Sequence, residues 1–263
     1  MKYMGSPGGL RGLFTFRQDL FKYLLPSGVP RSSFIILAGE GGSGKSVILA
    51  HIVKDFLSAG EPAIYVAIDD DPQTVINQLE SFGVNALEEC KSKRLIFIDG
   101  FSYLMQVKRP WPCVEEEITP EAPEKIVPAL WRIVERYKIV DQGVLIIDSL
   151  NDIVMLLDPT RVISFIKSLR ANFAKARGIL SIATLHTSTE SFRNYLLTIE
   201  HIVDGILETS SVPGELAQQL PIFVRAISVR KMKGVESRPG PTLYGINHEG
   251  LKPVVLRITR GSK

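Results

Sequence analysis

The chain has 263 residues, of which 45% are hydrophobic and 22% are charged, and its formal net charge is +3. This composition is ordinary for a soluble globular protein, and the length suits one large α/β domain better than two. No apolar run approaches the ~18 residues of a membrane span, and glycine and proline interrupt the N-terminal segment where a signal peptide would lie. We therefore expect a cytoplasmic protein with no membrane insertion.

The cysteine content points to the same compartment. The two cysteines, Cys90 and Cys113, lie far apart in the sequence and lack the spacing of metal ligands. We therefore expect neither a disulfide nor a zinc site, as in a reducing cytoplasm.

The predicted elements alternate between strands and helices. A loose glycine-rich arm and a short helix are predicted over residues 1–25. Five continuous apolar runs are typical of strands buried on both faces, as in a parallel sheet. These strands cover residues 34–38, 63–68, 95–98, 144–147 and 179–185, and the helices cover residues 47–58, 72–82, 125–138 and 162–176. The alternation predicts an α/β fold with a mostly parallel, twisted sheet flanked by helices.

Two stretches interrupt this alternation. Residues 101–124 hold four prolines and the acidic run Glu115–Glu117, and we predict a long irregular loop there. Near the C-terminus, strands at 223–229, 242–246 and 254–258 predict an antiparallel extension. Residues 221–263 carry nine Lys or Arg and two Asp or Glu, which indicates either a polyanionic partner or a solvated basic face.

A phosphate-binding loop follows the first buried strand. Residues 39–46 fit the pattern G-x-x-x-x-G-K-[ST], between a predicted strand and a predicted helix. The glycines let successive backbone N–H groups turn toward an anion, and the following helix directs its positive dipole end there. We predict that ATP binds to Gly39, Glu40, Gly41, Gly42, Ser43, Gly44, Lys45, Ser46 and Val47.

Specific roles follow for the charged and hydroxyl side chains of this loop. Lys45 is predicted to reach the β- and γ-phosphates, and the Ser46 hydroxyl to bind Mg²⁺. Asp148 ends the apolar run 144–147. In a P-loop fold an adjacent strand brings such a carboxylate to the Mg²⁺, so Asp148 is a second predicted metal ligand. The alternative is that Asp148 caps the next helix.

Three aspartates follow the second buried strand. Asp71 is predicted to cap the helix that starts at Pro72. Asp69 and Asp70 then remain available to orient or deprotonate an attacking water.

With these residues placed, the chain resembles the KaiC branch of the RecA-like ATPases. The resemblance rests on the phosphate loop together with residues 27–31, 60–72, 81–83, 144–150, 204–205 and 231–234. It implies a RecA-like ATPase domain over residues 26–263 that self-associates in rings or filaments, with ATP between subunits. It also implies a Lys-x-Arg pair that reaches a neighbour's phosphates, here Lys231 and Lys233, and a γ-phosphate sensor, here His186.

Two departures from the family pattern affect the expected rate of ATP hydrolysis. Asp69 and Asp70 stand where the family has a pair of glutamates, and Lys233 stands where the family has an arginine. A lysine cannot bind two oxygens at once as a guanidinium does. Both changes weaken water activation and transition-state stabilisation more than ATP binding. We therefore expect a slow Mg²⁺-dependent ATPase in which Lys45, Asp69, Asp70, His186, Lys231 and Lys233 act on the phosphates or the water. The alternative for His186 and the two late lysines is a solvated side chain at a strand end.

Three functions remain open. The first is an oligomeric, ATP-dependent switch that regulates a protein partner. The second is a RadA-type recombinase paralogue that binds single-stranded DNA through loops near 187–193 and 211–220. In those loops Arg193 is the only Lys or Arg and Phe192 the only aromatic residue, whereas DNA grooves usually need both kinds of side chain, so the loops favour the switch. The third is an autokinase, for which the sequence offers no identifiable acceptor site.

Overall fold

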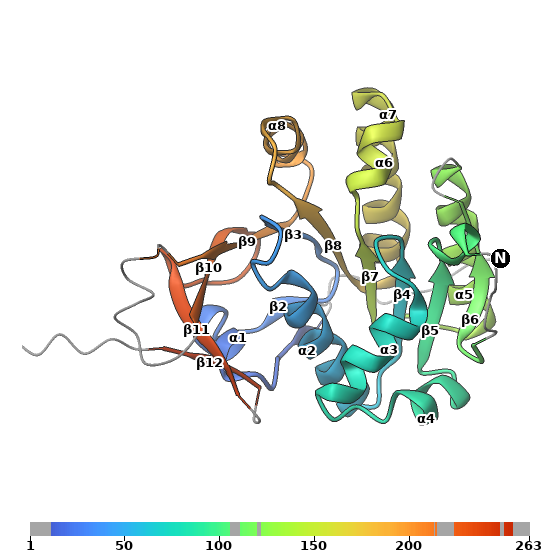
Figure 1. Ribbon diagram of the computed structural model, residues 1–263, viewed down its shortest axis with the longest axis horizontal. Helices are drawn as coiled ribbons and strands as arrows, with labels where there is room; N and C mark the ends of the chain where they lie inside the picture. Colours follow the sequence, from blue (N-terminus) through green and yellow to red (C-terminus); the bar gives the residue numbers. More distant parts are fainter. Residues whose placement is uncertain are drawn as a thin grey trace, which may run out of the picture.

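The computed structural model describes residues 12–105, 111–119, 122–212, 214, 224–247 and 250–254. Within them, one large sheet lies between two layers of helices (Figure 1). Its strand order is β12-β11-β10-β9-β3-β8-β7-β4-β5-β6. The strands from β9 to β6 run parallel to one another, whereas β10, β11 and β12 pair antiparallel. The predicted fold class is therefore confirmed.

The elements have the following bounds. The strands are β1 (Leu13–Phe14), β2 (Val29–Pro30), β3 (Phe34–Gly39), β4 (Ala63–Ala67), β5 (Leu95–Asp99), β6 (Val114–Glu117), β7 (Val144–Asp148), β8 (Leu180–His186), β9 (Gly205–Ser211), β10 (Val224–Met232), β11 (Thr242–Asn247) and β12 (Gly250–Pro253). The helices are α1 (Asp19–Leu24), α2 (Lys45–Ser58), α3 (Pro72–Ser81), α4 (Ala86–Lys91), α5 (Ile126–Arg136), α6 (Asn151–Leu156), α7 (Pro159–Leu169) and α8 (Glu190–Ile199). A π-helical segment, Arg170–Lys175, continues α7.

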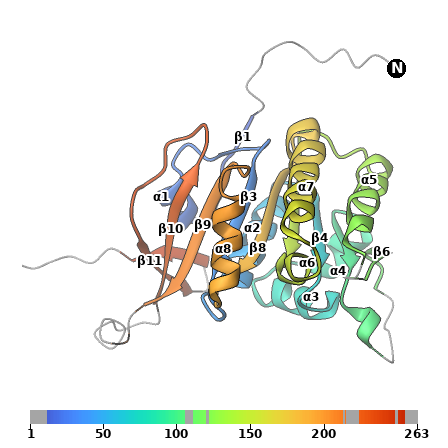
Figure 2. The same cartoon turned by 90° about the horizontal axis from the view of Figure 1, so that it is seen from above.

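Each face of the sheet has its own apolar core. Helices α1 to α4 cover one face, and α5 to α8 cover the other (Figure 2). Because successive side chains of a strand point to opposite faces, β3 sends Ile35 and Leu37 into the first core and Phe34 and Ile36 into the second. A strand covered on both sides needs an apolar residue at every position, which is why the continuous apolar runs located these strands.

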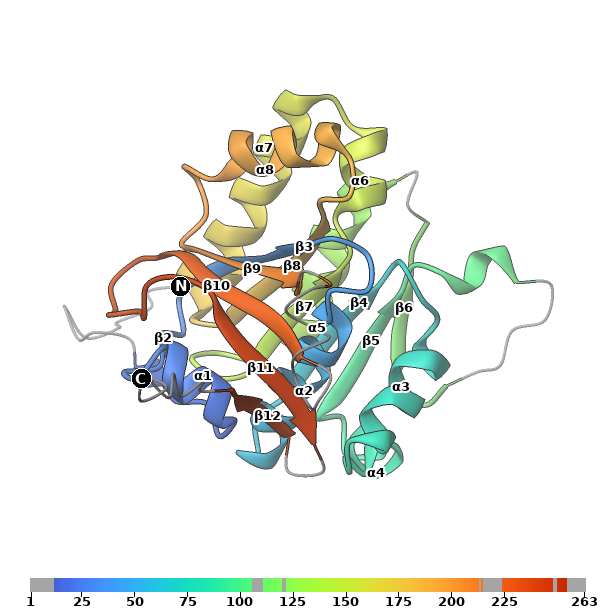
Figure 3. The same cartoon turned by 60° about the vertical axis from the view of Figure 1, so that its left-hand side comes forward.

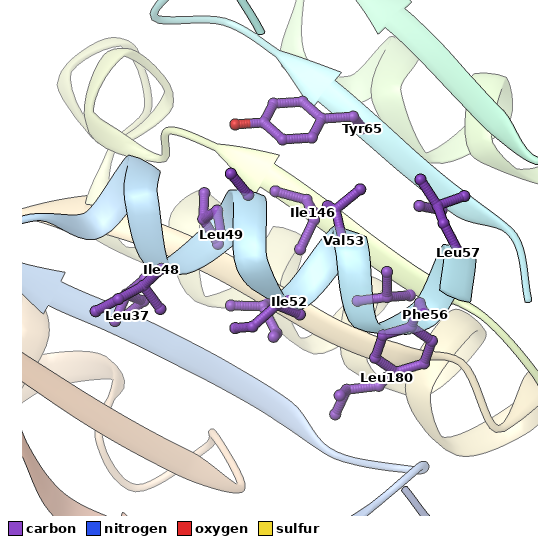
Figure 4. Packing of buried hydrophobic residues seen from close by; sticks show 14 of the residues in the cluster. Leu37, Ile48, Leu49, Ile52, Val53, Phe56, Leu57, Tyr65, Ile146 and Leu180 are labelled. Atoms are coloured by element: carbon purple, nitrogen blue, oxygen red, sulfur yellow. The ribbon is translucent and has the colours of Figure 1, made fainter. Parts of the chain in front are cut away.

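Helix α2 is fixed to the sheet by a stripe of apolar side chains (Figure 4). The side chains of the helix are Ile48, Leu49, Ile52, Val53, Phe56 and Leu57. They pack against side chains of the sheet, which are Leu37, Tyr65, Ile146 and Leu180. Burying one such aliphatic or phenyl side chain contributes about 1.5–3 kcal/mol. The first turn of α2, which carries the phosphate loop, is therefore held in a defined place.

The proline-rich stretch 101–124 is not irregular throughout, so that prediction was wrong in part. Val114–Glu117 form β6, an edge strand parallel to β5. Its glutamates form the ion pairs Lys93–Glu115, Arg136–Glu115 and Arg132–Glu116. Charged side chains on an edge strand discourage pairing with other sheets, and they also remove the apolar pattern that would have revealed the strand.

The two cysteines form a disulfide, contrary to the expectation from the sequence. Cys90, in α4, and Cys113, directly before β6, are both fully buried, and their Cα atoms lie 4.7 Å apart. The backbone N–H of Phe97 in β5 donates to the carbonyl oxygen of Cys113 at 2.7 Å, which places Cys113 beside β5. Separation in the sequence was therefore a poor guide to separation in space, and the cysteines no longer support a reducing compartment.

The C-terminal strands extend the sheet beyond β9 (Figure 3). The third of them in the described residues is Gly250–Pro253, which was not predicted. The strand predicted at 254–258 lies outside the described residues except for its first position, as do residues 259–263. The elements α4, α6, α8 and β9 were not predicted. None of the helices in the described part of the chain combines the length and apolar character that a membrane crossing requires.

A buried histidine on α2 gives the fold a dependence on pH. His51 is 1% exposed and packs against Phe82, with ring centroids 4.6 Å apart and the rings tilted by 40°. Neither ring nitrogen has a hydrogen-bond partner among the described residues. Burial, assisted by the charge of Lys54, lowers the pKa of His51 from 6.5 to about 4.

We expect His51→Leu to reduce the loss of stability in acid. As the pH falls from about 6.5 to about 4, the unfolded chain binds a proton at His51 and the folded protein does not, so the free energy of unfolding falls. A pKa shift of this size corresponds to about 3 kcal/mol. Urea unfolding at several pH values from about 7.5 to about 4 should show that the free energy of unfolding of the variant rises by about 3 kcal/mol relative to that of wild type. The exposed His201 provides the control His201→Leu, and a difference between His51→Leu and wild type that stays constant with pH would contradict the assignment.

Candidate functional site

The phosphate loop lies between the end of β3 and the start of α2. Its backbone turns through positive φ angles, 74° at Gly42 and 97° at Gly44. A Cβ atom at Gly44 would lie 2.7 Å from Cδ of Arg225 and 2.8 Å from Oη of Tyr244. Glycine is therefore required at position 44 both by the backbone conformation and by the close approach of β10 and β11.

Lys45 lies inside this loop. The side chain is almost fully buried, and Nζ donates to the carbonyl oxygens of Gly39 and Glu40, each at 2.9 Å. Burial lowers the pKa of Lys45, while the negative charges of Asp148 and Asp69 act in the opposite direction. The loop thus holds an ammonium group away from water beside two carboxylates, where it can exchange carbonyl oxygens for the oxygens of an anion.

The hydroxyls of this loop have different surroundings. Ser43 is buried and donates to the carbonyl oxygen of Glu40 at 2.7 Å, and its Oγ also lies 2.7 Å from Oγ1 of Thr209. Ser43 therefore fixes the shape of the loop. Ser46, in the first turn of α2, is exposed. Its hydroxyl lies at the helix end where the dipole favours negative groups.

Asp148 ends β7, and β8 lies between β7 and β3. The prediction of a directly adjacent strand was therefore wrong by one strand. The carboxylate accepts from Tyr65 at 2.6 Å and from Thr184 at 2.5 Å. It does not cap α6, whose N-cap is Leu150 with no side-chain cap bond. Burial raises the pKa of Asp148 against these two hydrogen bonds.

The three aspartates after β4 have separate roles. Asp71 accepts from the backbone N–H groups of Gln73 and Thr74 at 2.8 and 3.3 Å, so the predicted cap of α3 is confirmed. Asp69 accepts from the Ser149 hydroxyl at 2.7 Å, and its other oxygen lies 3.1 Å from Nε2 of His186. Burial opposes but does not outweigh these two hydrogen bonds, which lower the pKa of Asp69. Asp70 is exposed, and partial desolvation followed by the charge of Asp71 raises its pKa.

His186, at the end of β8, is therefore brought together with Asp69. Its backbone N–H donates to Oδ1 of Asn151 at 2.8 Å, and its carbonyl oxygen accepts from Nδ2 of Asn151 at 3.1 Å. The strand end that carries His186 is thus fixed to the start of α6.

Lys231 and Lys233 lie away from the phosphate loop. In the register of the sheet, Met232 pairs with Gly205 of β9, and Gly205 pairs with Ile35 near the start of β3, whereas the loop follows the end of β3. Nζ of Lys231 donates to the carbonyl oxygen of Glu200 at 2.5 Å, and burial followed by the charge of Lys233 lowers its pKa. Lys233 is exposed and lines a cavity of about 570 Å³ with Lys175 and Asp204.

The loop between β8 and α8 contacts the phosphate loop, which sequence reasoning missed. The backbone N–H of Gly41 donates to the Ser188 hydroxyl at 3.1 Å, and Arg193 pairs with Glu40 at 3.1 Å. A polar cavity of about 440 Å³ opens beside this contact. The only signal in the sequence was the position of these residues after a strand end. The predicted 187–193 loop includes the first turn of α8, and most of 211–220 lies outside the described residues.

Tyr244 was also missed. It is fully buried against Gly44, and its hydroxyl has no hydrogen-bond partner among the described residues. Burial raises the pKa of Tyr244 to about 12. The strand prediction for 242–246 gave no reason to place this side chain at the phosphate loop.

Comparison with known proteins agrees with this geometry. The family model "ATPase: KaiC" matches residues 18–256. A UPF0273 protein of Aeropyrum pernix is 25% identical over 246 residues, which covers 90% of this chain and 92% of that protein. A UPF0273 protein of Thermotoga maritima is 30% identical over 79 residues, which covers 30% of this chain and 33% of that protein.

A solved structure is also similar. The crystal structure of a KaiC-like protein from Pyrococcus horikoshii OT3 matches with a TM-score of 0.68 and 17% identity, over 93% of this chain and 99% of that chain. The low identity limits this likeness to the fold. The family match extends over most of the chain and includes the phosphate loop, Asp148 and the late lysines, so this protein belongs to the KaiC ATPase family.

Proposed function

We propose that the protein binds ATP with Mg²⁺ at the phosphate loop and hydrolyses the ATP slowly. The observation that carries this proposal is Lys45, an almost fully buried ammonium inside a loop whose glycines adopt positive φ angles. A buried cation is costly unless an anion accompanies it, and a triphosphate supplies that negative charge. Adenine as the base follows from the family, because this loop binds phosphates and not bases.

The oxygen atoms at the site fit Mg²⁺. Among the described residues no group of three or more His, Cys, Asp or Glu forms a complete metal site. Mg²⁺ typically takes one or two carboxylates and completes its shell with phosphate oxygens and water. The Ser46 hydroxyl and the Asp148 carboxylate are therefore the residues that would hold it, and the ion would neutralise charge on the phosphates.

Slow turnover is expected from the side chains available to activate the attacking water and to stabilise the charge on the phosphates. Both oxygens of Asp69 take part in hydrogen bonds, and its lowered pKa makes it a weak base. Asp70 is exposed, and its raised pKa suits it better to accept a proton. Lys233 supplies a point charge where a guanidinium would bind two oxygens.

We infer that the subunits assemble head to tail. The phosphate loop follows the carboxyl end of β3, and Lys231 and Lys233 lie near its amino end, so one subunit cannot bring them together. A neighbouring subunit can, and such heterologous contacts generate rings or filaments. ATP bound between subunits then promotes their association, which suits a switch that acts on a protein partner. Arg193 is engaged by Glu40, which supports this role over single-stranded DNA binding.

We expect wild-type turnover of ATP to lie below ~1 s⁻¹ and to be unchanged by single-stranded DNA.

We expect Asp148→Asn to lower ATP turnover by about 10-fold or more, because a neutral amide is a poor Mg²⁺ ligand, while ATP binding stays measurable. Phosphate release with and without EDTA measures the change in turnover. Asp158→Asn, which makes the same chemical change at the cap of α7, is the control. Equal turnover in Asp148→Asn and wild type would exclude the metal role.

A further inference from the structure

The carboxyl ends of β4, β7 and β8 are joined by a closed ring of hydrogen bonds. Its members are Asp69, Ser149, Asn151 and His186. Asp69 follows β4, Ser149 and Asn151 both follow β7, and His186 ends β8, so the ring fixes the relative positions of three strand ends beside the phosphate loop. Neither Ser149 nor Asn151 is among the site residues predicted from the sequence.

Asn151 makes the most specific contact in the ring. Its amide group donates to the carbonyl oxygen of His186 at 3.1 Å, and its carbonyl oxygen accepts from the His186 N–H at 2.8 Å. The side chain thus imitates a neighbouring strand, and it is 8% exposed. Only a carboxamide offers a donor and an acceptor side by side, so aspartate or alanine cannot satisfy both backbone groups.

Ser149 connects Asn151 to Asp69. A hydroxyl has one proton to donate, and the 2.7 Å contact with Asp69 is shorter than the 3.2 Å contact with Oδ1 of Asn151. The proton therefore goes to Asp69, and Ser149 Oγ accepts from the backbone N–H of Asn151 at 3.2 Å. Ser149 can take both roles because a hydroxyl is at once a donor and an acceptor, and the side chain is fully buried between its two partners.

The ring determines the tautomer of His186. Nε2 contacts Oδ2 of Asp69, which is an acceptor, so Nε2 carries the proton. Nδ1 of His186 takes part in no hydrogen bond with the described residues, and in this tautomer it carries the lone pair and can only accept a hydrogen bond. Asp69, with both oxygens occupied, holds the imidazole, while Asp70 lies outside the ring.

We infer that Asn151 and Ser149 are positioning residues for the ATPase reaction, and that they act by holding His186 and Asp69 in one arrangement beside the terminal phosphate. The inference rests on the proposed function. It assigns Asp69 to the orientation of His186 and leaves Asp70 to face the water. A group misplaced by about 1 Å costs on the order of 100-fold in rate, so small changes in this ring affect turnover more than binding.

The first test separates kcat from KM. Asn151→Ala should lower kcat by about 10- to 100-fold and leave KM for ATP within about 2-fold, because Lys45 and the loop stay intact. Ser149→Ala should behave alike, and Ser149→Thr, which restores the hydroxyl, should recover most of kcat. The control is Asn172→Ala, on the π-helical segment. It removes a side-chain amide that donates to Ser168 of α7. A wild-type kcat in Asn151→Ala overturns the inference, as does a parallel loss of kcat and nucleotide affinity in Ser149→Thr.

The second test does not depend on turnover. Two-bond ¹H–¹⁵N spectra, assigned with His186→Gln, report the tautomer of His186. In wild type we expect a single tautomer with the proton on Nε2, and in Asn151→Ala a mixture. If wild type shows no turnover but this change in tautomer is seen, the proposed ATPase activity fails and the positioning of His186 stands. If the spectra of wild type and Asn151→Ala are identical, the inference fails whatever the turnover.

Discussion

Lys45→Ala is expected to weaken ATP binding by about 100-fold or more, which corresponds to about 2.7 kcal/mol. Lys45 is the single Lys or Arg within the sequence of the loop, residues 39–46, and its two carbonyl partners cannot bind phosphate in its place. Removing a charged donor from a site shielded from water costs more than removing one at the surface. Isothermal titration with ATP and Mg²⁺ measures the effect.

A lysine on the same helix provides the control. Nζ of Lys54 donates to the carbonyl oxygen of Phe82, at the end of α3 and away from the phosphate loop. Lys54→Ala therefore tests the effect of losing a lysine from α2 without touching the site, and its ATP affinity should match that of wild type. An unchanged affinity in Lys45→Ala would refute the assignment of the loop.

The same variant tests whether subunits share a site. Lys45→Ala lacks a working phosphate loop, and Lys231→Ala/Lys233→Ala lacks the lysines proposed to act on a neighbour. Each should be inactive alone, but a mixture contains interfaces that combine one intact loop with one intact lysine pair. Partial recovery of turnover on mixing supports the shared site. Full turnover in the double lysine variant alone, together with a monomer in sedimentation with and without ATP, would exclude it.

Asp204→Ala is expected to reduce the free energy of unfolding by about 3–5 kcal/mol. Asp204 is buried, and it accepts from Arg170 at 2.9 and 2.8 Å, from Lys175 at 3.1 Å and from the backbone N–H of Phe34 at 3.0 Å. Burial opposes but does not outweigh these donors, which lower the pKa of Asp204 below its ordinary value of 3.8. Removing the carboxylate leaves a buried N–H and two cations without their acceptor.

Urea unfolding at neutral pH measures this loss. Asp19, whose carboxylate pairs with Lys22 and Lys252 and is 46% exposed, provides the control, and Asp19→Ala should cost less than about 1 kcal/mol. Since the pKa of Asp204 is lowered, its contribution is complete above pH 3.8 and disappears only as the pH falls through the folded pKa. A loss as small as that of Asp19→Ala would mean that the cluster around Asp204 contributes little.

The sequence predicted the parts of the fold that depend on local pattern. The apolar runs located β3, β4, β5, β7 and β8 because a strand covered on both faces has no polar positions. Asp71 before Pro72 predicted the start of α3 because capping needs only neighbouring residues. The phosphate loop was recognisable because its chemistry lies within eight consecutive residues.

Features that depend on distant contacts were not predictable. Edge strand β6 is stabilised by pairing with β5 and by charges on α5, and neither is visible in its own residues. The Cys90–Cys113 disulfide forms because β6 returns beside α4. The sequence named Asp69 and His186 separately, but their contact required the strand order to be known.

The contact between Gly41 and Ser188 places nucleotide binding in competition with a contact of the protein itself. The Gly41 N–H already donates to Ser188, and the neighbouring Glu40 is paired with Arg193 of α8. A phosphate oxygen that accepts from Gly41 competes with Ser188 for this N–H, and it thereby removes one contact of the segment that leads into α8. Such coupling is reciprocal. A molecule that binds α8 in its present place lowers the affinity of the loop for phosphate, and bound phosphate lowers the affinity for that molecule by the same factor. Among the described residues, the start of α8 is therefore a place where a bound molecule would be coupled to occupancy of the phosphate loop.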